Sequence, residues 1–176
     1  TDPLTGVSNR RHFLELLDAE LARVKRLRSQ AALLMTDLDH FKQVNDAYGH
    51  AAGDQVLKHY VGIIRQTLRK TDTIGRLGGE EFAILLPGDG IDGALELAER
   101  LRSRLEASPV LSDGALISIT VSIGIAALVR TDDTSDAPLQ RADVALYAAK
   151  EGGRNRVRIY QIVPDRTKVD PGKLPS

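Results

Sequence analysis

The pentapeptide Gly78-Gly79-Glu80-Glu81-Phe82 joins two short segments in a chain of 176 residues. Residues 73–77 precede it, and the apolar run 82–86, closed by Pro87-Gly88, follows it. Two such segments joined through glycines predict a β-hairpin over residues 72–87 with acidic residues at its tip. Glycine at such a tip can adopt positive φ and allows a ligand to approach the backbone closely. The two glutamates are therefore either solvated turn residues or ligands of a metal ion.

The composition limits the kind of protein this can be. A length of 176 residues suits one domain with a substantial core. The 24 basic and 24 acidic residues give no net charge, so bulk attraction to nucleic acid or anionic lipid is not indicated. Absence of cysteine excludes disulfides and thiolate metal sites and is compatible with a reducing compartment. We expect a cytoplasmic domain with no nucleic-acid partner and no membrane contact.

The chain begins at Thr1 without a methionine, and we expect it to be cut from a longer protein. The sequence leaves open whether that parent protein is membrane-anchored. No apolar run in the chain approaches the ~20 residues that a membrane-spanning helix needs.

Hydrophobic periodicity predicts alternating helices and strands along the chain. The continuous apolar run at residues 31–36 is typical of a strand buried on both faces. Residues 116–125 alternate between branched apolar and small residues, which predicts a strand with one exposed face. The other predicted elements are a helix capped by Ser8 or Asn9, a short helix at 40–45, a helix capped by Asp54, the hairpin, a helix at 91–105, a helix from 136 to Gly152-Gly153 and a strand at 157–161.

This order predicts an α/β fold of the α+β two-layer sandwich type. The core reads strand, helix, strand, strand, helix, strand, which is the ferredoxin-like βαββαβ pattern with a mixed, mostly antiparallel sheet. A helix precedes this core, and a helix and a strand are appended to it. We expect residues 1–161 to form the domain and residues 162–176, with prolines at 164, 171 and 175, to be disordered.

Two acidic residues from different elements indicate a metal site. Asp37 lies at the end of the predicted central strand, where a carboxylate is a common metal ligand. Asp39 is interpreted instead as the cap of the short helix that follows. Asp37 and Glu80 would meet if the central strand and the hairpin are neighbours in one sheet. Oxygen ligands without cysteine or clustered histidine favour Mg²⁺, which completes its shell with water and phosphate oxygens.

A phosphate-bearing ligand is therefore expected, although the chain has no P-loop motif. Backbone N–H groups at the start of the short helix, Lys42, Lys150 and Arg154 are candidates to bind it. Lys150 and Arg154 could alternatively do no more than compensate the dipole at the end of their helix. The histidines form no H-E-x-x-H motif or nucleophilic triad, and aromatics at 4% do not favour nucleic-acid binding.

Several segments of the sequence resemble those of a known family. The pentapeptide resembles the signature of GGDEF domains, the diguanylate cyclases, in its Glu-containing form. The resemblance runs from residue 2 to about residue 160. The other matching segments are Asp2 to Arg11, Asp37-Leu38-Asp39-His40-Phe41-Lys42-Gln43-Val44-Asn45-Asp46, His50 to Leu57, Ser122-Ile123-Gly124-Ile125-Ala126, Ala142 to Lys150 and Gly153-Arg154-Asn155.

The resemblance implies an enzyme that condenses two GTP into cyclic di-GMP and two pyrophosphates. It implies that Asp37, Glu80 and the Leu38 carbonyl hold Mg²⁺ or Mn²⁺, with Glu81 as a further acid whose role, metal ligand or proton acceptor, stays open. Asn45 and Asp54 would recognise guanine, since a carboxylate accepts from donors that guanine offers. The implied catalytic residues are Asp37, Lys42, Glu80 and Glu81, and the implied GTP-binding residues are Phe41, Lys42, Asn45, His50, Asp54, Gly79, Lys150 and Arg154.

A second site is implied by Arg69-Lys70-Thr71-Asp72, which is similar to the family's R-x-x-D product-inhibition site. Arg69 would bind cyclic di-GMP with Asp72, and Arg100 on the following helix could supply a second arm. Taken alone, an R-x-x-D segment is usually a surface ion pair.

The implied reaction needs a second GGDEF domain, because one domain binds one GTP. Two other functions stay open. The first is a catalytically silent module that binds GTP or cyclic di-GMP and acts through partners. The second is a fragment of a palm-type polymerase, which shares the fold but would need a positive field to hold a nucleic-acid duplex.

Overall fold

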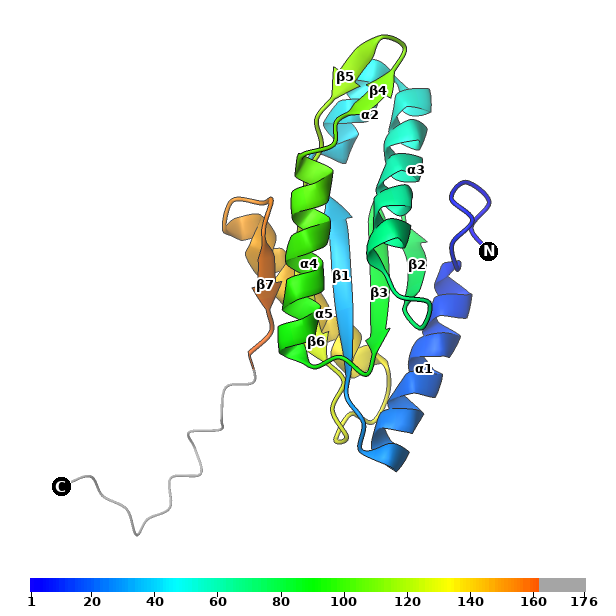
Figure 1. The fold of residues 1–176 in the computed structure, drawn as a ribbon, viewed down its shortest axis with the longest axis vertical. Helices are drawn as coiled ribbons and strands as arrows, with labels where there is room; N and C mark the ends of the chain where they lie inside the picture. Colours follow the sequence, from blue (N-terminus) through cyan, green and yellow to red (C-terminus); the bar gives the residue numbers. More distant parts are fainter. Residues whose placement is uncertain (162–176) are drawn as a thin grey trace, which may run out of the picture.

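Five strands form one sheet in the computed structural model, which describes residues 1–161 (Figure 1). The strand order is β2-β3-β1-β6-β7, with β1 antiparallel to both β3 and β6 and with β6 parallel to β7. This is the predicted ferredoxin-like order with an appended strand. The strands are β1 (Ala31–Leu38), β2 (Thr73–Gly78), β3 (Glu81–Pro87), β6 (Val121–Ala127) and β7 (Val157–Ile159).

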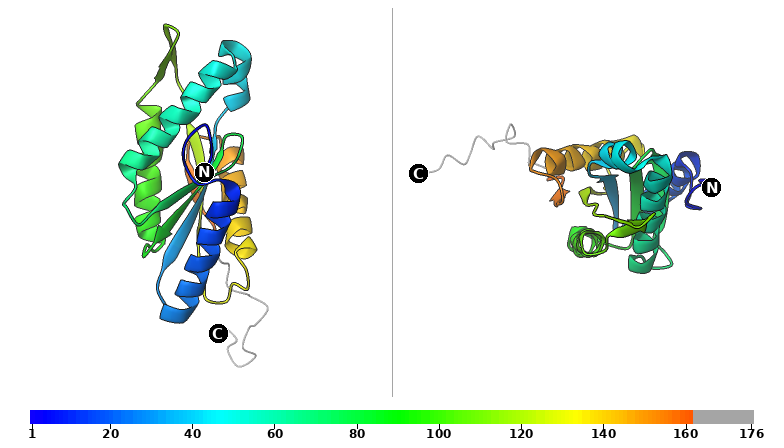
Figure 2. Two further views of the ribbon diagram at one scale, coloured as in Figure 1. Left: turned by 90° about the vertical axis from the view of Figure 1, so that its right-hand side faces the viewer. Right: turned by 90° about the horizontal axis from the view of Figure 1, so that it is seen from above.

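Helices cover both faces of this sheet (Figure 2). On one face α3 (His50–Thr67) and α4 (Ile91–Glu106) pack against alternate residues of β1, β3 and β6. On the other face α1 (Arg10–Leu27) and α5 (Asp136–Glu151) pack against the intervening residues. Both faces of β1 are consequently buried along its whole length, which confirms the interpretation of its continuous apolar run.

The predicted hairpin is present, and its tip lies at the end of β1. Asp37 of β1 is directly opposite Glu81 of β3, and the Leu38 N–H donates to the Glu80 carbonyl at 3.4 Å. Gly79 at the tip has φ +49°, so the left-handed conformation expected of a tip glycine occurs. Asp37 and the hairpin acids are therefore neighbours in the sheet.

The prediction of a half-exposed strand at residues 116–125 is wrong. β6 begins at Val121 and is buried on both faces. Residues 115–117 instead form β5 (Ala115–Ile117), which pairs with β4 (Val110–Ser112) in a hairpin beyond the sheet (Figure 1). The small residues Ser122 and Gly124 face α5 rather than water, because a Cβ atom added to Gly124 would lie 2.2 Å from the Leu146 backbone N. The small size of these two residues allows α5 to pack closely against β6.

Two predicted helix caps are also wrong. The cap of α2 (Phe41–Tyr48) is His40, with φ +57°, and the Asp39 side chain bonds elsewhere. Asp54 lies inside α3, because Gly49 ends α2 and α3 begins at His50. By contrast, the Asn9 Oδ1 accepts from the His12 N–H at 2.9 Å, so the predicted cap of α1 is confirmed. Residues 162–176, predicted to be disordered, lie outside the described residues.

No helix within residues 1–161 combines the length and the apolar character needed to cross a membrane.

The contact between α5 and β6 gives a testable prediction. In Gly124→Ala, the new methyl group meets the Leu146 N and the Ala142 carbonyl O at 2.2 and 2.3 Å, both of them backbone atoms of α5 that cannot rotate away. We expect the free energy of unfolding to fall by about 1–3 kcal/mol, as in overpacked cores. Urea unfolding followed by circular dichroism measures it.

Gly62→Ala is the matched control, since Gly62 lies within α3 and nothing is within 4 Å of the added carbon. It should raise stability by about 0.5–1 kcal/mol, because alanine favours a helix interior over glycine. Equal effects of the two substitutions would contradict the proposed role of Gly124 in packing.

Candidate active site

The carboxylates at the end of β1 form a crowded acidic group. Asp37 is 7% exposed, and the Lys150 Nζ donates to its Oδ2 at 2.6 Å. Burial raises the pKa of Asp37, Lys150 opposes this shift, and the charges of Glu80 and Asp39 add to it. Burial, and then the charge of Asp37, raise the pKa of Glu81. Desolvated carboxylates that repel one another favour binding of a cation.

A cavity of about 260 Å³ joins these acids to positive charges. The acids come from β1 and the hairpin tip, whereas the basic residues come from α2, the end of α5 and the loop after it. The cavity thus brings together six of the predicted site residues, from five structural elements. Its lining residues are Asp37, Leu38, Asp39, His40, Lys42, Gln43, Glu80, Lys150 and Arg154.

The start of α2 faces this same cavity. Because α2 begins at Phe41, the N–H groups of Phe41 and Lys42 lie in its first turn, where backbone donors have no partner within the helix. Those donors and the helix dipole favour an anion. The cavity therefore offers acids for a cation beside donors and cations for an anion.

Asp39 holds the loop that carries Arg154. Its buried carboxylate accepts from the Thr120 hydroxyl at 2.7 Å, the Ser122 hydroxyl at 2.6 Å and the Asn155 N–H at 3.0 Å. Arg154 and Asn155 both have positive φ, 61° and 47°, which is unfavourable for side-chain-bearing residues. The bond to Asp39 stabilises that turn at the cavity edge. Sequence reasoning missed this role because the Asp39 partners lie far along the chain.

Arg76 similarly holds the hairpin tip. Its Nε donates to the Gly79 carbonyl at 2.9 Å, and its Nη1 pairs with the Asp2 carboxylate at 3.3 Å. The side chain thus connects the N-terminal turn to the residue before Glu80. Sequence reasoning did not select Arg76 or assign a role to Asp2, although both lie within the segments that it quoted.

The residues predicted to recognise guanine lie outside this cavity, on α2 and α3. The Asn45 Oδ1 occupies the position that a side chain on Gly53 would take, at 1.8 Å from such a carbon. Asp54 follows Gly53 and is exposed, and His50 is exposed at the start of α3. The structure thus places Asn45 at the contact between the two helices, with the exposed Asp54 next to it in sequence on α3.

The R-x-x-D residues form a separate cluster. The Arg69 Nη2 donates to Asp72 at 3.1 Å and to Asp89 at 2.8 Å. A cavity of about 400 Å³ adjoins them and is also lined by Arg65 and Lys70. Arg100, the predicted second arm, lies on α4 with its Nη2 3.8 Å from Glu96 and does not line this cavity.

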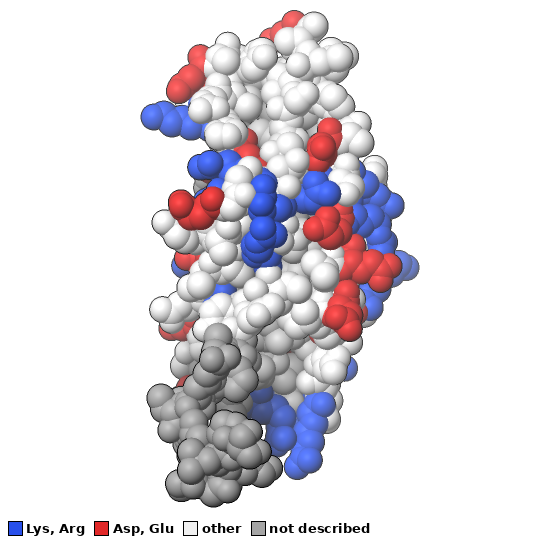
Figure 3. All heavy atoms as spheres, turned by 90° about the vertical axis from the view of Figure 1, so that its left-hand side faces the viewer, with Lys and Arg blue, Asp and Glu red and all other residues white. Residues whose placement is uncertain are grey.

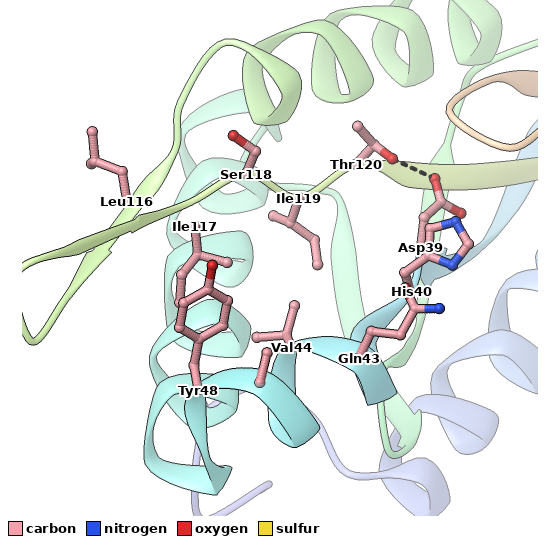
Figure 4. A pocket seen from close by; sticks show the side chains of 11 residues that line it. Asp39, His40, Gln43, Val44, Tyr48, Leu116, Ile117, Ser118, Ile119 and Thr120 are labelled. Carbon is pink, nitrogen blue, oxygen red and sulfur yellow. Dashed lines mark hydrogen bonds between the residues drawn. The ribbon is translucent and has the colours of Figure 1, made fainter.

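A larger cavity of about 560 Å³ adjoins the acidic cavity, and the two share Asp39, His40 and Gln43. Figure 4 shows Val44 and Tyr48 of α2 facing Ile117 and Ile119 across it. Charged side chains gather in the middle of the face in Figure 3, whereas its upper part carries few. None of the predicted site residues lines this cavity.

Within residues 1–161 no three His, Cys, Asp or Glu side chains are grouped so as to hold a metal ion by themselves. A cation at Asp37 and Glu80 would therefore need further oxygen ligands from the backbone, water or a bound phosphate. This suits Mg²⁺, which is usually held by one or two carboxylates together with substrate phosphates.

Comparison with known proteins identifies the family. The family model described as "Diguanylate cyclase, GGDEF domain" matches residues 1–156. The diguanylate cyclase DgcP of Pseudomonas aeruginosa is 45% identical over 159 residues, covering 90% of this chain and 24% of DgcP. The uncharacterized protein YhcK of Bacillus subtilis is 47% identical over 159 residues, covering 89% of this chain and 44% of YhcK. The chain thus spans less than half of the length of these relatives.

Solved structures agree with this match. The GGDEF domain of DgcB from Caulobacter crescentus, in complex with c-di-GMP, superposes with a TM-score of 0.88 at 34% identity, covering 92% of this chain and 93% of that one. An active GGEEF domain of a diguanylate cyclase from Vibrio cholerae superposes with a TM-score of 0.83 at 35% identity, covering 89% and 99%. The chain described here belongs to the diguanylate cyclase GGDEF domain family.

Proposed function

We propose that this chain is the catalytic domain of a diguanylate cyclase, formed by residues 1–161, which condenses two GTP into cyclic di-GMP and two pyrophosphates. One observation carries this proposal: a single cavity joins the acids Asp37 and Glu80 to the cations of Lys42, Lys150 and Arg154. Such a site suits a metal-bound nucleoside triphosphate. The c-di-GMP complex of the related DgcB domain supports the choice of product.

Asp37, Glu80 and the Leu38 carbonyl are the groups that would hold a divalent metal, Mg²⁺ or Mn²⁺. Burial, and to a lesser extent the neighbouring acids, raise the pKa of Asp37 and of Glu81, and such desolvated carboxylates fit a bound cation. When bound, the ion supplies positive charge at the α-phosphate and acidifies the attacking 3′-hydroxyl.

Lys150 has two roles in this proposal. Without a ligand its ammonium neutralises Asp37, with an N–O distance of 2.6 Å. With a divalent metal held by Asp37, the Lys150 ammonium would be available to bind the triphosphate. Lys42, Arg154 and the N–H groups of Phe41 and Lys42 bind the remaining phosphate oxygens.

Glu81 is a further acid of the site in this proposal, either as a metal ligand or as the acceptor of the 3′-hydroxyl proton. It lies directly opposite Asp37 in the sheet register. Burial, and then the charge of Asp37, raise its pKa, which suits acceptance of a proton. Asp54 and Asn45 recognise the guanine edge, and His50 and Gly79 complete the nucleotide site. The attacking hydroxyl comes from a second GTP, which a second copy of the domain presents.

Formation of cyclic di-GMP from GTP tests the proposed enzyme activity. Fusing the chain to a leucine zipper supplies the second copy, and we expect it to form cyclic di-GMP from GTP and Mg²⁺, measured by chromatography. Glu80→Ala should abolish product, because it removes one of the two carboxylates that hold the metal. A dimeric fusion that binds GTP but forms no product would contradict the enzyme proposal and favour the silent binding module.

Nucleotide affinity tests whether Asp54 recognises guanine. Asp54→Ala should lower GTP affinity about 10- to 100-fold, since a hydrogen bond to a charged group contributes about 1.5–3 kcal/mol. ATP affinity should change little, because adenine lacks the N1–H and N2–H₂ donors. Calorimetric titration with both nucleotides measures this, and Asp46→Ala, which removes a nearby exposed acid, is the control. Equal loss of both nucleotides would exclude guanine recognition by Asp54.

We also propose that Arg69 and Asp72 bind cyclic di-GMP as an inhibitor, with Arg100 as a second arm. Arg69→Ala should raise the inhibition constant of cyclic di-GMP at least tenfold without lowering the uninhibited rate, because the guanidinium that would bind the product is lost. Arg23→Ala, which removes an exposed arginine of α1, should leave inhibition unchanged. Unaltered inhibition in Arg69→Ala would rule out this site, and Arg100→Ala tests the second arm.

A further inference from the structure

We propose that the second copy of this chain docks on the face formed by α1 and α5, with Tyr147 of each copy entering a pocket of the other. This inference rests on the proposed function, which needs two domains facing each other. The pocket, here called the α1–α5 pocket, has a volume of about 370 Å³. It is lined by Arg10, Leu14, Met35, Leu77, Glu81, Leu139, Gln140 and Asp143.

The α1–α5 pocket is lined by both apolar and polar side chains. Leu14, Met35, Leu77 and Leu139 supply apolar surface between the two helices and the sheet. The charged and amide side chains of its lining come from the start of α1, from α5 and from β3. Its volume lies at the lower end of the ~300–1,000 Å³ typical of small-molecule sites. A single aromatic side chain, with a polar tip that reaches the rim, suits such a pocket.

The surface beside the pocket carries a matching side chain. Tyr147 of α5 is 64% exposed, and Val144 is 53% exposed. Tyr147 lies one helical turn beyond Asp143, so an exposed aromatic ring adjoins a pocket that is lined in part by apolar side chains. A two-fold interface uses the same surface twice, so residue i of one copy contacts residue j of the other and the reverse. An exposed ring next to a pocket is the arrangement that such an interface needs.

Charges on the rim are also self-complementary. Arg10 stands at the start of α1, whereas Asp143 and Glu81 stand across the pocket on α5 and β3. In a two-fold pair, Arg10 of one copy can approach Asp143 of the other. Arg10 would then place a cation of one copy beside the acids that line the pocket of the other.

The position of the pocket agrees with the reaction. Glu81 lines the pocket and lies opposite Asp37 in the sheet, so the pocket adjoins the acids proposed to bind the metal. Figure 2 shows α1 and α5 on the same side of the sheet. A copy docked on this side brings its own Asp37 and Glu81 toward those of the first, which places two bound GTP molecules across the symmetry axis.

Cysteine cross-linking tests the contact without turnover, because the chain contains no cysteine. Asp143→Cys places a thiol close to the proposed axis, and we expect mild oxidation to give a covalent dimer of the 176-residue chain, increased by Mg²⁺ and a non-hydrolysable GTP analogue. Lys58→Cys, at an exposed position of α3 on the opposite face, is the control. Equal cross-linking of both variants would overturn the proposal.

Activity provides a second, separate readout. In the zipper fusion, Tyr147→Ala should lower cyclic di-GMP formation at least tenfold while GTP binding to a single copy stays unchanged. Leu111→Ala, which removes a 68% exposed residue of the β4–β5 hairpin, should not lower it. Full activity of Tyr147→Ala would overturn the proposed surface. Absence of product from the unsubstituted fusion would instead contradict the cyclase proposal, and cross-linking would still decide the docking surface.

Discussion

The contact between Lys150 and Asp37 is the interaction on which the site depends. It joins the end of α5 to the end of β1, with an N–O distance of 2.6 Å. A carboxylate buried at this depth needs a compensating charge, because an unpaired buried charge is costly. Lys150 can supply it only because α5 lies directly on β6, where Gly124 leaves room for the helix backbone. The close packing of α5 on β6 is therefore also what allows the charge of Asp37 to be balanced.

The sheet order explains why the site forms at this end of β1. Since β1 lies between β3 and β6, its end adjoins both the hairpin tip and the start of β6. The chain then turns into α2, so helix N–H groups follow the acid directly. The loop after α5 returns to the same place before β7. Three segments that are distant from β1 in sequence thus meet α2 around one buried carboxylate.

Sequence reasoning predicted the features that depend on local patterns. The apolar run of β1 and the glycines of the hairpin identified two neighbouring elements, and their pairing placed Asp37 beside the tip. The errors concern residues whose partners lie far away. Asp39 bonds to Thr120, Ser122 and Asn155, up to 116 positions along the chain, so its local resemblance to a helix cap was misleading. The small residues of β6 were taken for an exposed face because sequence does not show which helix covers them.

Arg76 shows why a motif alone does not specify a site. The position of Glu80 depends on Gly79, which adopts φ +49° and has its carbonyl bound by Arg76. Arg76 is itself paired with Asp2, whose carboxylate also accepts from the Thr5 N–H at 2.9 Å. The N-terminal turn and the hairpin tip are consequently parts of one hydrogen-bonded unit, although 74 positions separate Asp2 from Arg76. A displacement of the first residues is thus opposed by the same bonds that orient the acid of the tip.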